Sequence, residues 1–503
     1  MFKIKKEDIK KRYVIGTILV FISILIVASV IWGNRTFSVK ALAQIIFHLK
    51  VPMSGTDNGI YLDWFIWCVP ASIVATIIID VFFFMIHKLF RRKKELQENI
   101  SKHIRKRFVW IGSFSIVITL IFTLINYDVY GYFTNVIQKT DLYEQYYVDP
   151  STANITFPEK KRNLIHIYLE SIESTYTSTA SGGAYENGYM DDLETLANDN
   201  INFSNNNMIG GSTTIDGTQW TIAAMVAQSA GIPLILPIEG NSYGKNSLFL
   251  PGSYTIGEIL QEQGYNQEFL TGSDSDFAGT SNFFSQHGDY DIMDYSRAKE
   301  EGRIPEDYFD GFWGYEDKKL FTFAKEDILE LAESGEPFNM TMVTIDPHTP
   351  DGQLDETCPS NFSSQYENVI ACQSSQVYEF VEWAKQQDFY ENTTIVITGD
   401  HNSMASKFFD GLDSNYIRTP YNVIINSAVE PENEKNRLFT TMDWYPTILA
   451  SLGVEIEGDK LGLGTNLFSN KKTLLEEVGF DYLSNEVQKT SDFYNHEIIG
   501  LKD

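Results

Sequence analysis

The sequence predicts an α/β fold: a mainly parallel central sheet with helices on both faces, preceded by a membrane anchor of three helices. Three observations lead to this prediction. Three apolar stretches of about 20 residues fall in the first quarter of the chain. After them, short apolar runs alternate with helical stretches, which is the pattern of a parallel sheet. Four of those runs end on acidic residues or histidines.

The three apolar stretches are residues 13–32, 65–86 and 108–127, each long enough to cross the hydrocarbon core as a helix. Residues 1–12 carry six Lys and Arg and residues 88–107 carry nine, whereas residues 33–64 carry three. Because positive charge collects on the cytoplasmic side, we expect a multi-pass membrane protein with a cytoplasmic N-terminus and with the part after residue 127 outside the cytoplasm.

The chain is strongly acidic, with a formal net charge of −28 over its 503 residues. The excess of acidic residues lies mainly in the last part of the chain, because residues 108–503 hold 21 Lys and Arg against 60 Asp and Glu. Such a surface argues against nucleic acid as a partner. We expect a membrane anchor over 1–127, a linker over 128–160 and one globular domain over 161–503.

The globular domain has five recognisable strand candidates. They are 164–169, 267–270, 339–345, 394–398 and 421–425, with helices expected at 220–230, 375–387 and 443–452. His166 lies in the middle of the first strand, and we assign it to structure. No internal repeat is visible, and nothing in the sequence indicates the oligomeric state.

Four of these strands run directly into chemically active side chains. "NLIHIYLES" ends on Glu170, "NQEFLTGSDSDF" on Ser273 and Asp274, "FNMTMVTIDPHTPDG" on Asp346 and His348, and "TTIVITGDHNS" on Asp400 and His401. The carboxyl ends of parallel strands meet at one edge of a sheet, where open α/β folds bind their ligands. An acid at one strand end often only caps the next helix. Four such endings predict a site.

A nucleophile is expected in the glycine-rich loop and helix of residues 208–234, "MIGGSTTIDGTQWTIAAMVAQSAGIPL". Thr218 is the prediction, because a hydroxyl at a helix start lies where backbone N–H groups favour a phosphate or an alkoxide. The alternative is that Thr218 is only the helix cap. Thr213, Thr214 and Thr221 are rivals for the role.

A metal ion is expected beside this hydroxyl, because threonine is a poor nucleophile at neutral pH unless its alkoxide is stabilised. Glu170, Asp400 and His401, with Thr218 as fourth ligand, supply mostly oxygen donors. This set suits Mn²⁺ or Mg²⁺, with Zn²⁺ as a further candidate. Only five histidines follow the anchor, so a histidine-rich two-metal site is hard to assemble.

The chain has three cysteines, and Cys68 lies in the second apolar stretch. Cys358 and Cys372 are fourteen residues apart in the external part. Either they pair as one disulfide, as an oxidising compartment permits, or they are two buried thiols.

Residues of about 160 to 470 resemble the alkaline phosphatase and sulfatase superfamily, and within it the membrane-anchored phosphoglycerol transferases that include lipoteichoic acid synthase. The resemblance rests on "IYLESIESTY", "GTQWTIAAMVAQSAGIPL", "FAGTSNFFSQHGD", "DPHTPDG", "YENVIAC", "TGDHNS", "TTMDWYPTILASLGV" and "LGLGTNLF", in this order. The branch that decorates periplasmic glucans is the most similar, because two cysteines flank "YENV". Sulfatases carry Cys or Ser in a Cys/Ser-x-Pro-x-Arg context, where this chain has Gly217, Thr218 and Gln219.

The resemblance implies an enzyme of the bacterial cell membrane with an extracytoplasmic catalytic domain. It implies that this enzyme transfers phosphoglycerol from phosphatidylglycerol in the bilayer to a glycan or glycerol-phosphate acceptor. It implies that Glu170, Thr218, Asp400 and His401 bind the metal and that Thr218 takes up phosphoglycerol. His348 is similar to a histidine that binds the transferred phosphate and exchanges a proton with the departing or arriving hydroxyl. Asp274 and Ser273 resemble contacts to the glycerol group. The alternatives are a phosphoethanolamine transferase and a non-catalytic glycan-binding relative.

Overall fold

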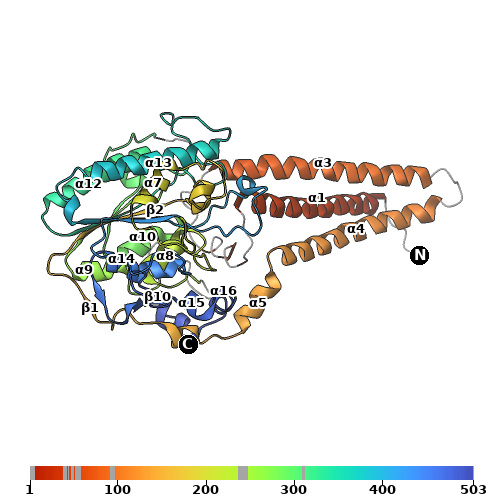
Figure 1. Ribbon diagram of the computed structural model, residues 1–503. Coiled ribbons are helices and arrows are strands. Elements are labelled where there is room, and N and C mark those ends of the chain that lie inside the picture. Colours follow the sequence, from red (N-terminus) through yellow and green to blue (C-terminus); the bar gives the residue numbers. More distant parts are fainter. Residues whose placement is uncertain are drawn as a thin grey trace. The chain divides into compact units, whose positions relative to one another are not determined.

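The computed structural model describes residues 6–37, 42, 45–46, 50, 58–90, 97–235, 247–308 and 312–501. The chain divides into two compact units, which Figure 1 shows in sequence colours. The first comprises Met1–Leu42 and Asp57–Tyr132, and the second comprises Ala43–Thr56 and Phe133–Asp503.

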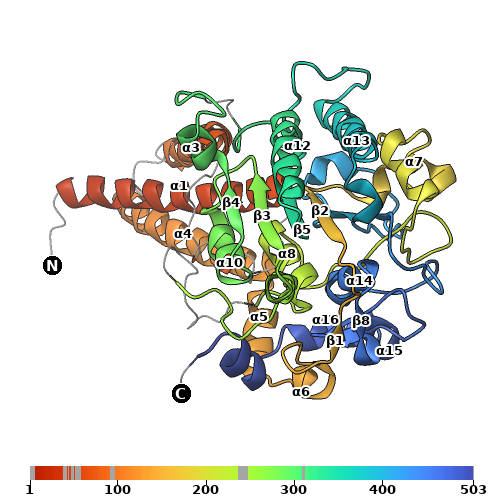
Figure 2. The same cartoon turned by 90° about the vertical axis from the view of Figure 1, so that its left-hand side faces the viewer.

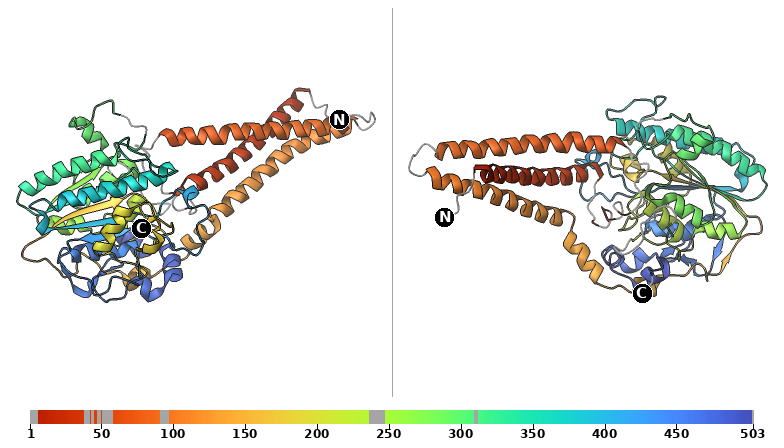
Figure 3. Two further views of the ribbon diagram at one scale, coloured as in Figure 1. Left: turned by 45° about the horizontal axis from the view of Figure 1, so that its top comes forward. Right: turned by 180° about the vertical axis from the view of Figure 1, so that it is seen from behind.

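The first unit consists of three long helices, which confirms the expected anchor. They are α1 (Lys6–Phe37), α3 (Asn58–Phe90) and α4 (Gln97–Asn126). Their membrane-spanning parts, by length and composition, are Tyr13–Thr36, Gly59–Phe83 and Phe108–Asn126. The two views of Figure 3 show these helices in red and orange.

Helix α1 packs against both α3 and α4. A Cβ atom added at Gly16 of α1 would lie 2.3 Å from the ring of Phe108 in α4, so glycine permits the close approach of the two helices. Toward α3, the Thr17 hydroxyl donates a hydrogen bond to Asp80 over 2.9 Å. A carboxylate within an apolar helix therefore has a partner inside the anchor.

The second unit is built on a six-stranded sheet with the order β4-β3-β5-β2-β6-β7. Strands β2, β3, β4, β5 and β6 are parallel, and β7 pairs antiparallel with β6. Figure 2 shows β4, β3, β5 and β2 side by side. The bounds are β2 Asn163–Leu169, β3 Asn266–Thr271, β4 Asp291–Met293, β5 Phe338–Val343, β6 Thr393–Gly399 and β7 Asn422–Ile425.

The predicted strands agree with these bounds to within two residues, because the strands are almost entirely buried. Strand β4 was not predicted, since it has three residues and begins with an exposed aspartate. Helix α13 runs over Gln365–Ala384, so it begins ten residues before the predicted start at 375. Ser364 and Glu367 form a capping box at that earlier start.

Helices cover both faces of the sheet, as the fold class predicted. One face packs against α7 (Asp191–Asp199), α12 (Asp317–Glu333) and α13, and the left view of Figure 3 shows α12 and α13 across it. The other face packs against α8 (Thr221–Ala230), α9 (Ile256–Glu262), α10 (Thr280–Gln286) and α14 (Trp444–Ser451). Successive side chains of β2 alternate between the two faces, so Ile165 and Ile167 belong to the first core and Tyr168 to the second.

The segment 128–160, expected as a linker, has defined structure and joins the second unit from Phe133 onward. It contains α5 (Val129–Ile137), α6 (Leu142–Tyr146) and β1 (Ile155–Thr156), and β1 pairs with β8 (Glu455–Ile456). Leu142 and Tyr143 are buried in the second core. The remaining elements are α11 (Tyr295–Glu300), β9 (Lys460–Leu461), β10 (Gly464–Thr465), α15 (Leu474–Val478), α16 (Phe480–Val487) and several single turns of helix.

Candidate active site

The four predicted strand endings lie at the same edge of the sheet. Strands β3, β5, β2 and β6 are consecutive neighbours and run parallel, so the residues after each strand emerge on one side. Strand β6 ends at Gly399, where a Cβ atom would lie 2.0 Å from the carbonyl oxygen of Ile172. Glycine therefore allows the chain to pass close to the end of β2 and to deliver the next two side chains beside Glu170.

Glu170, Asp400 and His401 form a compact buried group. One ligand atom from each lies within 4.8 Å of the others, and all three residues are at most 3% exposed. Nε2 of His401 lies 3.3 Å from Oδ2 of Asp400 and 3.9 Å from Oε1 of Glu170. The structure thus brings together three of the four residues predicted to hold a metal.

The hydrogen bonds around this group leave its inner atoms facing one another. Asp400 Oδ1 accepts from the backbone N–H groups of Ser171 (2.9 Å) and His401 (2.7 Å), but Oδ2 has no hydrogen-bond partner among the described residues. His401 Nδ1 lies 2.9 Å from the carbonyl of Asn402 and must donate to it, so the lone pair of the neutral ring is on Nε2. An unpaired buried carboxylate oxygen beside an imidazole lone pair fits a divalent cation.

The electrostatics agree with a cation site. Burial, followed by the neighbouring Glu170 carboxylate, raises the pKa of Asp400 to about 7. Burial lowers the pKa of His401, but Asp400 and Glu170 outweigh it and the net shift is upward. For Glu170, burial raises the pKa, and the combined effect of His348, His401 and the Ser171 hydroxyl lowers it overall. Two carboxylates and an imidazole buried together need a positive charge to balance them.

The hydroxyl next to this group belongs to Thr221, whereas the hydroxyl of Thr218, the predicted ligand and nucleophile, bonds elsewhere. Thr221 Oγ1 donates to Glu170 Oε2 over 3.2 Å and lies 3.4 Å from His401 Nε2. Thr218 is fully buried, and its hydroxyl bonds to the backbone of Ile215, accepting from N–H over 3.0 Å and donating to the carbonyl over 2.9 Å. Its oxygen is occupied in closing a turn.

The position of the helix start explains why Thr221, and not Thr218, contacts this group. Helix α8 begins at Thr221 with Trp220 as its cap, and Trp220 makes no side-chain capping bond. Thr218 therefore lies before the helix, whereas Thr221, one of its three rivals, occupies the first turn. The backbone N–H groups and the positive end of the dipole of α8 act at Thr221.

His348 lies in the loop after β5, partly exposed. Nδ1 donates to the carbonyl of Thr349 over 3.0 Å, which leaves the lone pair of the neutral ring on Nε2. Its charge is one of the influences that lower the pKa of Glu170, so the imidazole acts on the buried group electrostatically. The ring packs against Trp313, with 4.4 Å between centroids.

Ser273 and Asp274 follow β3 at the same edge, and both are partly exposed. The Ser273 hydroxyl pairs with the Thr271 hydroxyl over 2.9 Å. Asp274 Oδ1 accepts from the backbone N–H of Asp276 over 2.9 Å. The structure therefore places both residues in the loop that follows β3, and among the described residues Ser273 makes no hydrogen bond to Glu170, Asp400 or His401.

An ion pair that the sequence did not reveal supports the loop after β6. Arg418 binds both carboxylate oxygens of Glu173, which is fully buried, and its guanidinium also donates to the carbonyl of Ser403. Ser403 N–H in turn donates to Glu173 Oε1 over 3.0 Å. These bonds fix the backbone two residues beyond His401. Glu173 follows Glu170 by three residues, but no local signal marks Arg418 as its partner.

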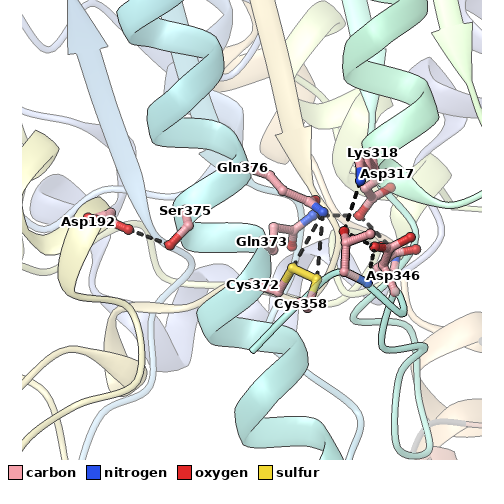
Figure 4. The surroundings of a disulfide bond; sticks show 11 residues. Asp192, Asp317, Lys318, Asp346, Cys358, Cys372, Gln373, Ser375 and Gln376 are labelled. Atoms are coloured by element: carbon pink, nitrogen blue, oxygen red, sulfur yellow. Dashed lines mark hydrogen bonds between the residues drawn. A yellow bond between two sulfur atoms is a disulfide. The ribbon is translucent and has the colours of Figure 1, made fainter. Parts of the chain in front are cut away.

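Cys358 and Cys372 form a disulfide with 5.7 Å between their Cα atoms. It joins the long loop that follows His348 to helix α13, and Figure 4 shows Gln373 and Gln376 of α13 beside it. Gln373 donates to Asp317 over 2.8 Å, and Asp317 also accepts from the backbone N–H groups of Ile345 and Asp346. The start of the His348 loop is thereby held against α12 and α13.

His166 proves to be structural, as predicted. It is 3% exposed, and its Nε2 lies 3.3 Å from the Thr398 hydroxyl on the neighbouring strand β6. Burial lowers its pKa to about 3, so the ring is neutral.

Comparison with known proteins places this site in a family. The chain is 30% identical over 341 residues to phosphoglycerol transferase I of Escherichia fergusonii. The matched segment covers 65% of this chain and 41% of that protein. The corresponding protein of Escherichia coli O6:K15:H31 is 31% identical over the same length and coverage. The chain thus spans about two fifths of the length of the curated relatives it matches.

Among solved structures, a member of the alkaline phosphatase superfamily from Vibrio parahaemolyticus is 21% identical with a TM-score of 0.49, covering 61% of this chain and 71% of that one. The lipoteichoic acid synthase LtaP from Listeria monocytogenes is 16% identical with a TM-score of 0.49, covering 63% and 79%. A family model described as Sulfatase matches residues 162–454, which is more than half of the 503 residues. The chain therefore belongs to the Sulfatase family.

Proposed function

We propose that this protein transfers phosphoglycerol from phosphatidylglycerol to a glycan or glycerol-phosphate acceptor, through a covalent intermediate on Thr221. The observation that carries the proposal is the contact of the Thr221 hydroxyl with Glu170 and His401 at the first turn of α8. Relatives named phosphoglycerol transferase I support the choice of the transferred group.

Glu170, Asp400 and His401, with the Thr221 hydroxyl as fourth donor, are the residues that would hold a divalent metal. Mn²⁺ and Mg²⁺ suit the oxygen donors best, and Zn²⁺ also accepts this set. When bound, the ion supplies positive charge that favours the alkoxide of Thr221 and neutralises charge on the phosphate.

In the first step, Thr221 Oγ1 attacks the phosphorus of phosphatidylglycerol and its proton passes to Glu170 Oε2, the acceptor of its hydrogen bond. The bond between phosphorus and the diacylglycerol oxygen breaks. His348, in its protonated form, gives a proton from Nε2 to the departing oxygen, so diacylglycerol leaves as a neutral alcohol.

In the second step, an acceptor hydroxyl attacks the phosphorus of the Thr221 ester. His348 Nε2, now neutral, takes the proton of the attacking hydroxyl. The bond between phosphorus and Thr221 Oγ1 breaks, and Thr221 recovers its proton from Glu170. Both residues return to their starting protonation, so the cycle closes without another proton donor.

The membrane anchor suits a lipid donor. A site tethered to the bilayer meets phosphatidylglycerol at a high local concentration, as a linked binding module does. We propose that the catalytic unit lies on the extracytoplasmic side, because the positively charged segments 1–12 and 88–107 favour the cytoplasm.

The proposal is tested with full-length protein in vesicles that contain phosphatidylglycerol labelled in its headgroup glycerol, with Mn²⁺ added. We expect release of diacylglycerol and intact-protein mass spectra that show one phosphoglycerol group, located on Thr221 by peptide sequencing. Peptide mapping of the label to any residue other than Thr221 would refute the covalent step, and a mass increase of phosphoethanolamine in mixed lipid would select the other transferase class.

A further inference from the structure

Outside the group of Glu170, Asp400 and His401, the indole nitrogen of Trp313 is a buried polar atom without a hydrogen-bond partner among the described residues. Trp313 is 9% exposed. Burying an N–H group without an acceptor is costly, and native proteins rarely leave one unpaired. An unpaired donor next to a candidate catalytic residue indicates a ligand atom that completes the bond.

Trp313 is held rigidly beside the site from two sides. Its ring lies 4.4 Å from that of His348 and 5.2 Å from that of Phe277, measured between centroids. The next residue, Gly314, pairs through its backbone with Ser273. The indole is therefore fixed between the loop that follows β3 and the loop that follows β5.

We propose that the Trp313 N–H donates a hydrogen bond to a hydroxyl oxygen of the glycerol headgroup and so selects phosphatidylglycerol as the donor. This inference rests on the proposed function and names a specificity residue for it. Indole nitrogen can only donate, so it needs an acceptor atom, and a hydroxyl oxygen of the glycerol headgroup is such an acceptor.

The indole N–H disfavours other headgroups. The ammonium of ethanolamine has three donors and no acceptor, so it cannot receive the indole N–H. A headgroup without hydroxyls leaves the indole unpaired, and sites built to bind a hydroxyl strongly reject analogues that lack it. If a phosphate oxygen were the acceptor instead, lipids that differ only in the hydroxyls of the headgroup would react at equal rates.

The test compares the wild type with Trp313→Phe, which keeps an aromatic ring and removes the indole N–H. Full-length protein in vesicles with Mn²⁺ is given either phosphatidylglycerol or phosphatidylpropanol, whose headgroup has no hydroxyl. The rate of adduct formation on Thr221 is measured by intact mass, so no acceptor is needed. Trp383→Phe is the matched control, because Trp383 packs on Phe380 and Phe389 in the helical layer.

We expect the wild type to react about tenfold faster with phosphatidylglycerol than with phosphatidylpropanol, a ratio typical of one lost hydrogen bond. Trp313→Phe should react with both lipids at the rate that the wild type shows with phosphatidylpropanol, and Trp383→Phe should behave as the wild type. Thermal unfolding of the three proteins monitors folding.

Three results would overturn the inference. Equal wild-type rates with the two lipids would do so without any variant, even if Trp313→Phe fails to fold. An unchanged preference of Trp313→Phe for phosphatidylglycerol would also do so. An equal decrease in the rate of adduct formation with both lipids would do so as well, because a structural role predicts it. A wild type that forms no adduct with either lipid would instead remove the proposed function and this inference with it.

Discussion

The Thr221 hydroxyl oxygen lies 3.2 Å from Oε2 of Glu170, although 51 residues separate the two in the chain. The contact exists because β2 ends at Leu169 while α8 begins at Thr221, and both ends meet at the same edge of the sheet. The hydroxyl thus combines the positive end of a helix with a buried acidic group. This geometry is suited to a nucleophile that attacks a phosphate.

Replacing Thr221 tests this geometry against its nearest rival. We expect Thr221→Ala to abolish adduct formation, because no other hydroxyl among the described residues hydrogen bonds to Glu170 Oε2. Thr218→Ala should keep the adduct on Thr221 but lose about 1–3 kcal/mol of unfolding free energy, since it leaves the buried backbone N–H of Ile215 without its acceptor. Intact mass and thermal unfolding measure the two effects. The reverse pattern, with Thr218 essential and Thr221 dispensable, would restore the original assignment.

The metal site is tested by neutralising one carboxylate. Asp400→Asn should weaken Mn²⁺ binding by at least about 100-fold, because outer-shell changes alone cost 10–100-fold and Asp400 Oδ2 is an inner, unpaired oxygen. In the wild type, Mn²⁺ at 100 times its Kd should add about 2.7 kcal/mol to the unfolding free energy. Calorimetric titration of the full chain in detergent measures the affinity.

Asp410→Asn is the control for the metal site, because Asp410 is an exposed carboxylate only ten residues further along the chain. It should bind Mn²⁺ as the wild type does. If Asp400→Asn also binds Mn²⁺ with unchanged affinity, the ion does not lie among Glu170, Asp400 and His401.

The sequence predicted that Glu170, Asp400 and His401 lie together, but it did not single out the Thr221 hydroxyl that contacts them, and the physical reason differs between the two. Glu170, Asp400 and His401 each follow a buried apolar run, and parallel strands bring such endings together. The position of the nucleophile depended on the first residue of one helix. Trp220 caps that helix without a side-chain bond, so the usual start signal was absent and Thr218, three residues before Thr221, had the stronger local pattern.

The Glu173–Arg418 pair could not be predicted either, because 245 residues separate its members. No periodicity connects two side chains in different loops. The same holds for Trp313 and His348, whose contact follows from the pairing of two loops at the sheet edge. The sequence revealed that the site lies at the carboxyl edge of the sheet, but it did not reveal how the loops at this edge pack against one another.

Removing Arg418 should destabilise the protein strongly. Arg418→Met leaves the fully buried Glu173 carboxylate without its ion pair, which costs about 3–5 kcal/mol for buried pairs. Glu173→Gln combined with Arg418→Met should recover part of this loss, because the buried charge is then gone. Chemical unfolding of the variants measures the free energies.

The control for this ion pair is Lys385→Met, which breaks an exposed pair with Glu382 on α13. Surface pairs contribute at most about 1 kcal/mol, so its stability should stay close to the wild type. Equal losses of unfolding free energy in Arg418→Met and Lys385→Met would mean that burial of Glu173 has no energetic consequence.

Stability should also depend on pH through Glu268, a buried carboxyl in β3. Burial, followed by the charge of Asp327 and then Asp291, raises its pKa to about 9, while Arg303 opposes the shift. Because the folded pKa is above the unfolded value, the folded state binds the extra proton between about pH 4.5 and 9. The stabilisation is therefore complete below about pH 4.5 and is lost as the pH rises through about 9.

Glu268→Gln isolates this effect, because glutamine keeps a donor toward Asp327 but does not titrate. We expect the melting temperatures of the two proteins to be similar at pH 5 and that of the variant to exceed the wild type by a growing margin toward pH 9. Both are measured as full chains with a chelator, so that metal binding does not contribute to the difference. A margin that shrinks as the pH rises would mean that Glu268 is ionised in the folded protein and paired with Arg303 instead of sharing a proton with Asp327.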